Sequence, residues 1–222
     1  MKRLITNYAK YNSWATNEMI KSLIFNPITK KPVPLDDLNK DIKLYFNSVN
    51  GTIQHIILAD ELHYERQTGG EIQSKFGEVT KLWGINKWDG EEMTAWESII
   101  VQNDTQELQG QQEESVENRS LDGINIHDIN SGEELFQIWL ENVARWVVFV
   151  ETLSEEDLNR TFEYFDTAGK KFSMHRGESL IHIFNHGTHH RGQISAALVQ
   201  MGYYCDGLDY SYSPFIEKTS LD

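Results

Sequence analysis

The chain has 222 residues, a length typical of one large domain, and we expect a single domain over residues 1–222. Hydrophobic residues make up 39% of it and aromatic residues 11%, which supplies a buried core and excludes disorder of the whole chain. The formal charge is −14, because 34 acidic residues outnumber 20 basic ones. A surface this negative repels phosphate groups, so we expect neither nucleic-acid binding nor adhesion to an anionic membrane.

The cysteine content and the hydropathy of the chain indicate where in the cell we expect the protein. Cys205 is the only cysteine, which excludes an internal disulfide and a cysteine-rich zinc site. We interpret it as a partly buried small residue rather than a catalytic thiol. The N-terminal basic residues have no apolar run behind them, and no segment approaches the roughly 18 apolar residues of a membrane span. We therefore expect a cytoplasmic protein without a signal peptide.

Apolar residues spaced three and four apart predict a series of amphipathic helices. The predicted helices cover residues 4–24, 36–67, 91–109, 131–150 and 178–201. Asp36 and Asp37 are placed to cap the second of these helices, and Gly202 is placed to end the last one. Residues 131–134 have the S-x-x-E form of a capping box.

Two short segments, residues 161–165 and 171–174, are predicted to pair as a small hairpin across Ala168 and Gly169. The tail from residue 203 to residue 214 alternates aromatic and polar side chains, and we expect it to pack over the helices. The predicted fold class is therefore all-α, with four or five helices and one small β element.

Histidines on the last predicted helix are the strongest indication of chemistry. His186 and His190 are four residues apart, so their Cβ atoms lie about 5–6 Å apart on one helix face. That separation allows two imidazole nitrogens to bind one metal ion at about 2.0–2.1 Å each. Because two ligands rarely bind a metal tightly, a third is expected from a neighbouring helix. His55 and His63 are both candidates, and sequence spacing alone does not choose between them.

Other interpretations of the same helix weaken this prediction when spacing is taken alone. A pair of histidines four residues apart also arises by chance on a polar helix face. His182 extends the stripe by one more turn, but three successive turns diverge too far to meet at one ion. Residue 187 is glycine where the zinc-protease helix motif has its glutamate base, so peptidase chemistry of that kind is disfavoured.

Three segments resemble the DinB-like (YfiT-like) family, and they occur in the order in which that family has them. The family's first helix reads roughly Y-x-x-Y-N-x-W-A-N and its last helix N-H-x-x-H-H-R-G-Q. The matching segments here are YAKYNSWATNE at residues 8–18, HIILADE at 55–61 and NHGTHHRGQI at 185–194. The stretch from 67 to 130 is longer and less familiar.

The resemblance implies an up-and-down four-helix bundle, usually a homodimer, here with an extended middle insertion. It also implies one divalent transition metal bound by one histidine of the second helix and two of the last. In this sequence those ligands are His55, His186 and His190, which decides against His63. Neutral imidazoles suit zinc and nickel, which we expect first, and iron is a further candidate.

The resemblance leads to two functional hypotheses. The first is a metal-dependent enzyme that transfers a low-molecular-weight thiol to a small electrophilic substrate, or that hydrolyses its substrate. The second is a metal-binding stress-response protein without catalysis. The sequence offers no clear general base, so no catalytic residue is assigned. Because free imidazoles protonate near pH 6–6.5, metal affinity is expected to weaken as the pH falls through that range.

We also expect structural roles for several residues of the DinB-like segments. Asp60 and Glu61 are near enough in sequence to support His55 with a carboxylate, although helix spacing favours Ala59 for that position. We expect a structural ion pair at Arg191. The remaining expectations are close helix packing at Gly192 and core positions for Tyr11 and Trp14.

Overall fold

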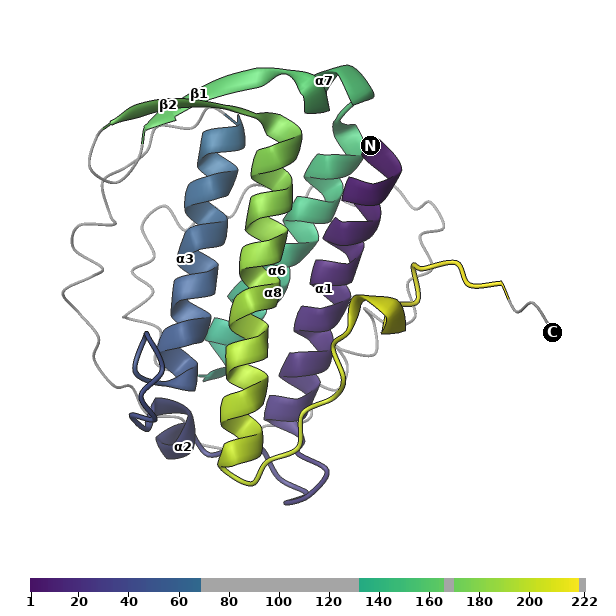
Figure 1. Cartoon of the computed structure of the whole chain (residues 1–222). Helices are drawn as coiled ribbons and strands as arrows, with labels where there is room; N and C mark the ends of the chain where they lie inside the picture. The colour runs from purple at the N-terminus through teal and green to yellow at the C-terminus, as the bar shows by residue number, and fades with distance from the viewer. Residues whose placement is uncertain (69–131, 166–169, 220–222) are drawn as a thin grey trace.

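The computed structural model describes residues 1–68, 132–165 and 170–219, and its four long helices form a bundle (Figure 1). These helices are α1 (Lys2–Ile24), α3 (Val49–Thr68), α6 (Gly132–Thr152) and α8 (Arg176–Gln200). The all-α prediction is confirmed, and α1, α6 and α8 match three predicted helices closely. The predicted helix at 91–109 lies outside the described residues, as does Ser131 of the predicted capping box.

Each long helix packs against two of the others. Helix α1 contacts α6 and α8, and α3 contacts the same two helices. In Figure 1, α1 and α8 run from the top of the bundle to the bottom, whereas α3 and α6 run upwards. The α3–α8 pair is therefore antiparallel, and both of its helices carry histidines.

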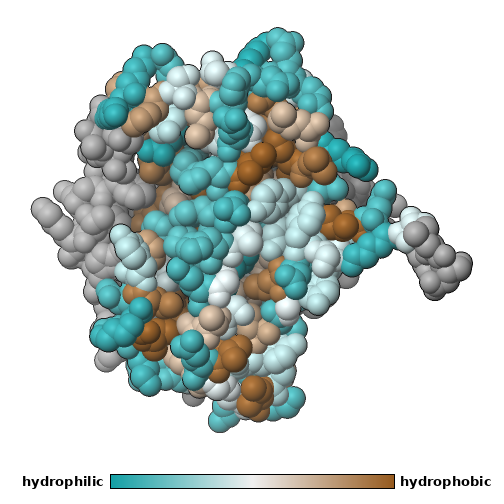
Figure 2. Space-filling model, viewed as in Figure 1, coloured by the Kyte–Doolittle hydropathy of each residue, from teal (hydrophilic) through white to brown (hydrophobic). Residues whose placement is uncertain are grey.

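Buried aromatic residues of α6 fill the interior. Trp139 packs among residues of all four helices, and Trp146 belongs to a second group near the hairpin end of the bundle. Burying a side chain of this size stabilises the fold by roughly 1.5–3 kcal/mol. The surface is mixed, because hydrophobic patches in Figure 2 lie between hydrophilic ones. Within the described part of the chain, no helix has the length and apolarity to cross a membrane.

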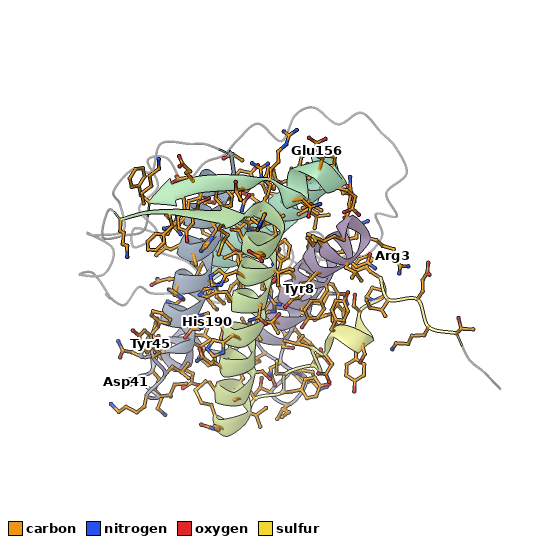
Figure 3. All side chains as sticks on the ribbon, turned by 45° about the horizontal axis from the view of Figure 1, so that its top comes forward. Arg3, Tyr8, Asp41, Tyr45, Glu156 and His190 are labelled. Atoms are coloured by element: carbon orange, nitrogen blue, oxygen red, sulfur yellow. The ribbon has the colours of Figure 1, made fainter. Side chains whose placement is uncertain are left out.

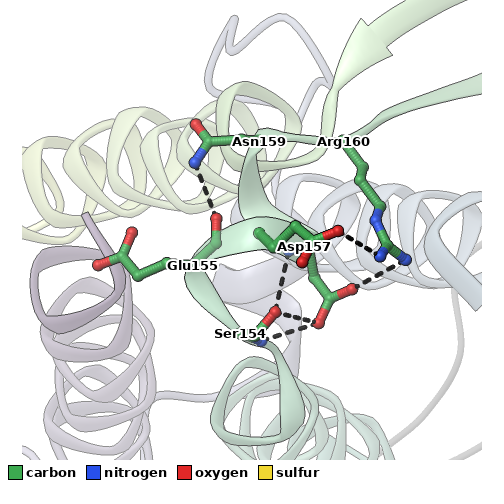
Figure 4. A network of polar contacts seen from close by, with 6 residues as sticks. Ser154, Glu155, Asp157, Asn159 and Arg160 are labelled. Atoms are coloured by element: carbon green, nitrogen blue, oxygen red, sulfur yellow. Dashed lines mark hydrogen bonds and ion pairs between the residues drawn. The ribbon is translucent and has the colours of Figure 1, made fainter.

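A short connection joins α6 to α8. Helix α7 (Glu155–Asn159) begins with a capping box, in which the Asp157 N–H donates to Ser154 Oγ at 3.1 Å and the Ser154 N–H donates to the Asp157 carboxylate at 2.9 Å (Figure 4). The predicted hairpin follows and is confirmed: β1 (Thr161–Phe165) pairs antiparallel with β2 (Lys171–His175).

The predicted helix at 36–67 is wrong over residues 40–48, which are not helical. Helix α2 (Leu35–Asn39) ends after about one turn, and α3 begins only at Val49. Lys43 and Asn47, which lie between them, both have a φ of 64°, a left-handed conformation that interrupts a right-handed helix. Ser48 then caps α3, because its Oγ accepts a hydrogen bond from the N–H of Gly51 at 3.0 Å.

Close helix packing involves a different glycine from the one expected. A Cβ at Gly192 would meet no atom within 4 Å, so the expectation for Gly192 is wrong. At Gly187, a Cβ would lie 2.8 Å from Oδ1 of Asn12 and 3.0 Å from Nη1 of Arg191. Gly187 is thus the residue that leaves room for a polar contact between α8 and α1.

These two glycines give a matched test of packing within one helix. We expect Gly187→Ala to lower the free energy of unfolding by about 1–3 kcal/mol, because the new methyl group displaces Asn12 or Arg191. Gly192→Ala should be neutral or stabilising by up to about 1 kcal/mol, because alanine favours helix more than glycine does. Urea unfolding followed by circular dichroism measures both. Equal effects of the two substitutions would contradict this assignment.

Candidate metal centre

The α3–α8 contact brings the three predicted histidines together. Nε2 of His55 lies 3.0 Å from Nε2 of His186, and Nε2 of His190 lies 3.1 Å from that same atom. Among the described residues, these three form the one group of His, Cys, Asp and Glu side chains compact enough to bind a metal ion. In Figure 3 the labelled His190 lies on the α3 side of α8.

The donor geometry is close to that of a metal site. Bonds of about 2.0–2.1 Å in a tetrahedral arrangement would separate two ligand nitrogens by about 3.3–3.4 Å. The two separations from His186, 3.0 and 3.1 Å, are slightly shorter than this, and all three ligand atoms lie within 4.8 Å of one another. Nitrogen lone pairs about 3 Å apart repel each other unless a proton or a cation lies between them. The arrangement is compatible with binding of a divalent metal.

A glutamine that the sequence analysis missed orients one of the histidines. Nδ1 of His190 is 2.7 Å from Oε1 of Gln193, and Nε2 of Gln193 is 3.2 Å from Nε2 of His189. An amide oxygen only accepts, so Nδ1 of His190 carries the proton and its Nε2 lone pair points into the group. Such an outer partner normally fixes the tautomer of a metal-binding histidine. Gln193 lies three residues after His190 on the predicted helix, and this spacing could have indicated the contact.

Phe46 is the second residue that the sequence analysis missed. Its ring stacks on the ring of His55, with centroids 3.8 Å apart, and meets the ring of His190 edge to face at 5.6 Å. The prediction of one continuous helix over 36–67 hid this contact, because it placed Phe46 on a regular helix instead of on the turn before α3.

Two further histidines, one on α3 and one on α8, form a separate pair. The rings of His63 and His182 have centroids 5.2 Å apart, and the ring of His182 lies 6.2 Å from that of His186. No third His, Cys, Asp or Glu of the described residues completes a metal-sized group with them. The structure thus places His63 against His182, away from the group of three.

The neighbouring carboxylates do not reach the histidines. Glu61 forms an ion pair with Arg145 of α6. Asp60 is buried, its Oδ2 has no partner, and burial raises its pKa to about 7 although the charge of Arg191 opposes that rise. The described contacts therefore assign neither residue to the support of His55.

Arg191 makes hydrogen bonds where an ion pair was expected. Its guanidinium donates to Oδ1 of Asn12 at 2.5 Å and to Oγ1 of Thr188 at 3.2 Å. Within the described ranges, no carboxylate lies at ion-pair distance from it, so the expected ion pair is wrong. The reason is that α1 presents an amide at the point where the side chain of Arg191 reaches it.

A cavity of about 860 Å³ lies on the other flank of α8, between α8, α1 and the C-terminal tail. The labelled Tyr8 in Figure 3 belongs to that flank. Tyr11 is buried as predicted and also lines the cavity, whereas Trp14 is only half-buried. The Tyr11 hydroxyl donates to the carbonyl oxygen of Leu208 at 2.7 Å, which confirms that the tail packs over the bundle. Burial raises the pKa of the Cys205 thiol, in agreement with a packing role.

The three histidines resist protonation. Burial, together with the charges of neighbouring histidines, lowers the pKa of His55 to about 4 and that of His186 to about 3. Burial also lowers the pKa of His190, although the hydrogen bond to Gln193 opposes this shift. The imidazoles of His55 and His186 are therefore neutral well below the range of pH 6–6.5 expected for free side chains, and the pKa of His190 is lowered in the same direction.

This lowering sets the pH dependence of metal binding. We expect the dissociation constant for zinc to rise far less between pH 8 and pH 5 than the roughly 10⁴-fold of three free imidazoles, and to rise steeply as the pH approaches the lowered values of about 4 for His55 and about 3 for His186. Competition with a chromogenic chelator measures it. A weakening on the order of 10⁴-fold that starts near pH 6.5 would show that the imidazoles titrate as free side chains.

The same histidines also affect the stability of the fold, so the zinc measurement needs a folding control at each pH. A histidine whose pKa is lowered on folding binds fewer protons in the folded than in the unfolded state. Stability is therefore full above the unfolded pKa near 6.5 and falls as the pH drops from there toward the folded values. Circular dichroism at each pH separates loss of the fold from loss of the metal.

Comparison with known proteins agrees with the geometry. Protein DinB of Bacillus subtilis (strain 168) is 25% identical to the chain over 210 residues, which cover 95% of this chain and 93% of that protein. No solved structure gave a significant match. The family model described as the DinB family matches residues 1–219, and the chain therefore belongs to the DinB family.

Proposed function

We propose that the protein binds one divalent transition metal through His55, His186 and His190 and uses it in catalysis. Zinc and nickel are the first candidates and iron is a further one. The observation that supports this proposal is the convergence of three neutral imidazoles, from two helices, to within 4.8 Å of one another. Three protein ligands leave a position for water or substrate, whereas structural zinc sites use four.

The chain's own residues prepare the site for such a metal. Gln193 fixes the tautomer of His190, and the lowered pKa of each histidine keeps its lone pair available at neutral pH. A metal bound there would supply Lewis acidity, which lowers the pKa of a thiol or water ligand. The reaction class we propose is transfer of a low-molecular-weight thiol to a small electrophile, with hydrolysis as the variant in which water replaces the thiol.

A non-catalytic role in metal binding is the second candidate. The observation that favours it is the absence, among described residues, of a carboxylate in contact with the three histidines. Without such a carboxylate, catalysis would depend on the Lewis acidity of the metal and on acid–base groups of the substrate itself. A metal-binding protein of the stress response needs no such group.

A thiol-transfer assay distinguishes the two candidates. Protein loaded with zinc, nickel or iron is mixed with a panel of small thiols and 1-chloro-2,4-dinitrobenzene, whose chloride leaves as the carbon–sulfur bond forms. We expect the metal-loaded wild type to exceed His186→Ala at least tenfold in rate with one thiol, because His186 contacts both other ligands. His175→Ala is the matched control on an exposed histidine remote from the group.

The outcomes of this assay are separable. Stoichiometric metal without turnover of any thiol in the panel would favour the non-catalytic candidate. Equal rates for wild type and His186→Ala would contradict catalysis at this site.

A further inference from the structure

We infer that Phe46 is a positioning residue of the metal centre: its ring holds the imidazole of His55 in place and closes one side of the centre to water. The inference rests on the proposed function, because it assumes a metal at the three histidines. It adds a residue from outside the DinB-like segments of the sequence, on the turn between α2 and α3.

The stacking geometry is the first observation. The rings of Phe46 and His55 are nearly parallel, with an interplanar angle of 19° and centroids 3.8 Å apart. The same phenyl ring meets the ring of His190 at 61° and 5.6 Å. One apolar side chain thus touches two of the three histidines, and it covers the edge of the group that His55 and His190 share.

His55 depends on this contact for its orientation. His190 is oriented by a hydrogen bond from Nδ1 to Gln193. Metal-binding histidines normally use that second nitrogen to fix their ring. The ring of His55 contacts His186 through Nε2 and stacks on Phe46, so packing against Phe46 holds this ring.

The turn that carries Phe46 is defined by its own backbone. The Ile42 N–H donates to the carbonyl of Asn47, and the Asn47 N–H donates to the carbonyl of Leu44, both at 2.9 Å. Lys43 and Asn47 adopt left-handed φ values of 64°. Non-glycine residues remain in that region only where the surroundings determine it, and such residues gather at functional sites.

A phenyl ring beside a metal has a definite chemical effect. It provides no ligand atom and no hydrogen-bond partner for water, so a coordinated water on its side would lose its solvation. The apolar wall around a metal site controls solvent access and the local dielectric. With Phe46 in place, the metal should bind fewer water molecules than it would without the ring, and it should dissociate slowly.

Cobalt(II) substitution tests this inference without an activity assay. Four- and five-coordinate cobalt absorbs visible light strongly, whereas six-coordinate cobalt absorbs weakly. We expect strong absorption in the wild type, and in Phe46→Ala a several-fold weaker band together with at least tenfold faster metal loss to a chelator. Phe46→Tyr, which keeps the flat ring, should restore both values. Ile28→Ala is the control, because Ile28 is 63% exposed on the turn after α1 and lies outside the group that Phe46 contacts.

Phe46→Leu guards against a folding failure, because it keeps apolar volume and loses only the flat ring. We expect it to remain folded by circular dichroism and to release cobalt faster than the wild type. Spectra and dissociation rates of Phe46→Ala and Phe46→Leu equal to those of the wild type and Ile28→Ala would overturn the inference alone. A wild type that binds no cobalt, nickel or zinc would overturn the proposed metal centre and the inference with it.

Discussion

Packing of α3 against α8 places His55 within 3.0 Å of His186, although 131 residues separate them in sequence. Because the two helices are antiparallel neighbours, one histidine on α3 can face two histidines spaced one turn apart on α8. Gly187 allows the Arg191 side chain to reach α1 beside them, where it donates to Asn12. The candidate centre is thus fixed by helix packing, and its outer contacts come from Gln193 on α8 and from Phe46 on the turn before α3.

The long helices could be predicted because their apolar spacing is regular, and the family resemblance was enough to choose His55 over His63. The turn before α3 could not be predicted in the same way. Its apolar residues continue the helical pattern, while the left-handed backbone at Lys43 and Asn47 depends on contacts made only in the folded chain. Phe46 was hidden for this reason.

Side-chain partners were the least predictable feature. Gly187 and Gly192 look alike in sequence, and only the approach of α1 distinguishes them. The expected ion pair of Arg191 does not form, because the guanidinium donates to the side-chain amide of Asn12. Asp60 is buried, and its Oδ2 has no partner. Burial also lowers the histidine pKa values far below those of free imidazole, an effect that no sequence pattern reports.

Metal content tests the central claim most directly. Tag-free protein is reconstituted with zinc and analysed by mass spectrometry for wild type, His55→Ala and His63→Ala, two histidines of the same helix. We predict about one equivalent of metal in the wild type and in His63→Ala, and its loss in His55→Ala, because two remaining ligands bind a metal weakly. Retention of the metal in His55→Ala, or its absence from the wild type, would contradict a centre built on His55, His186 and His190.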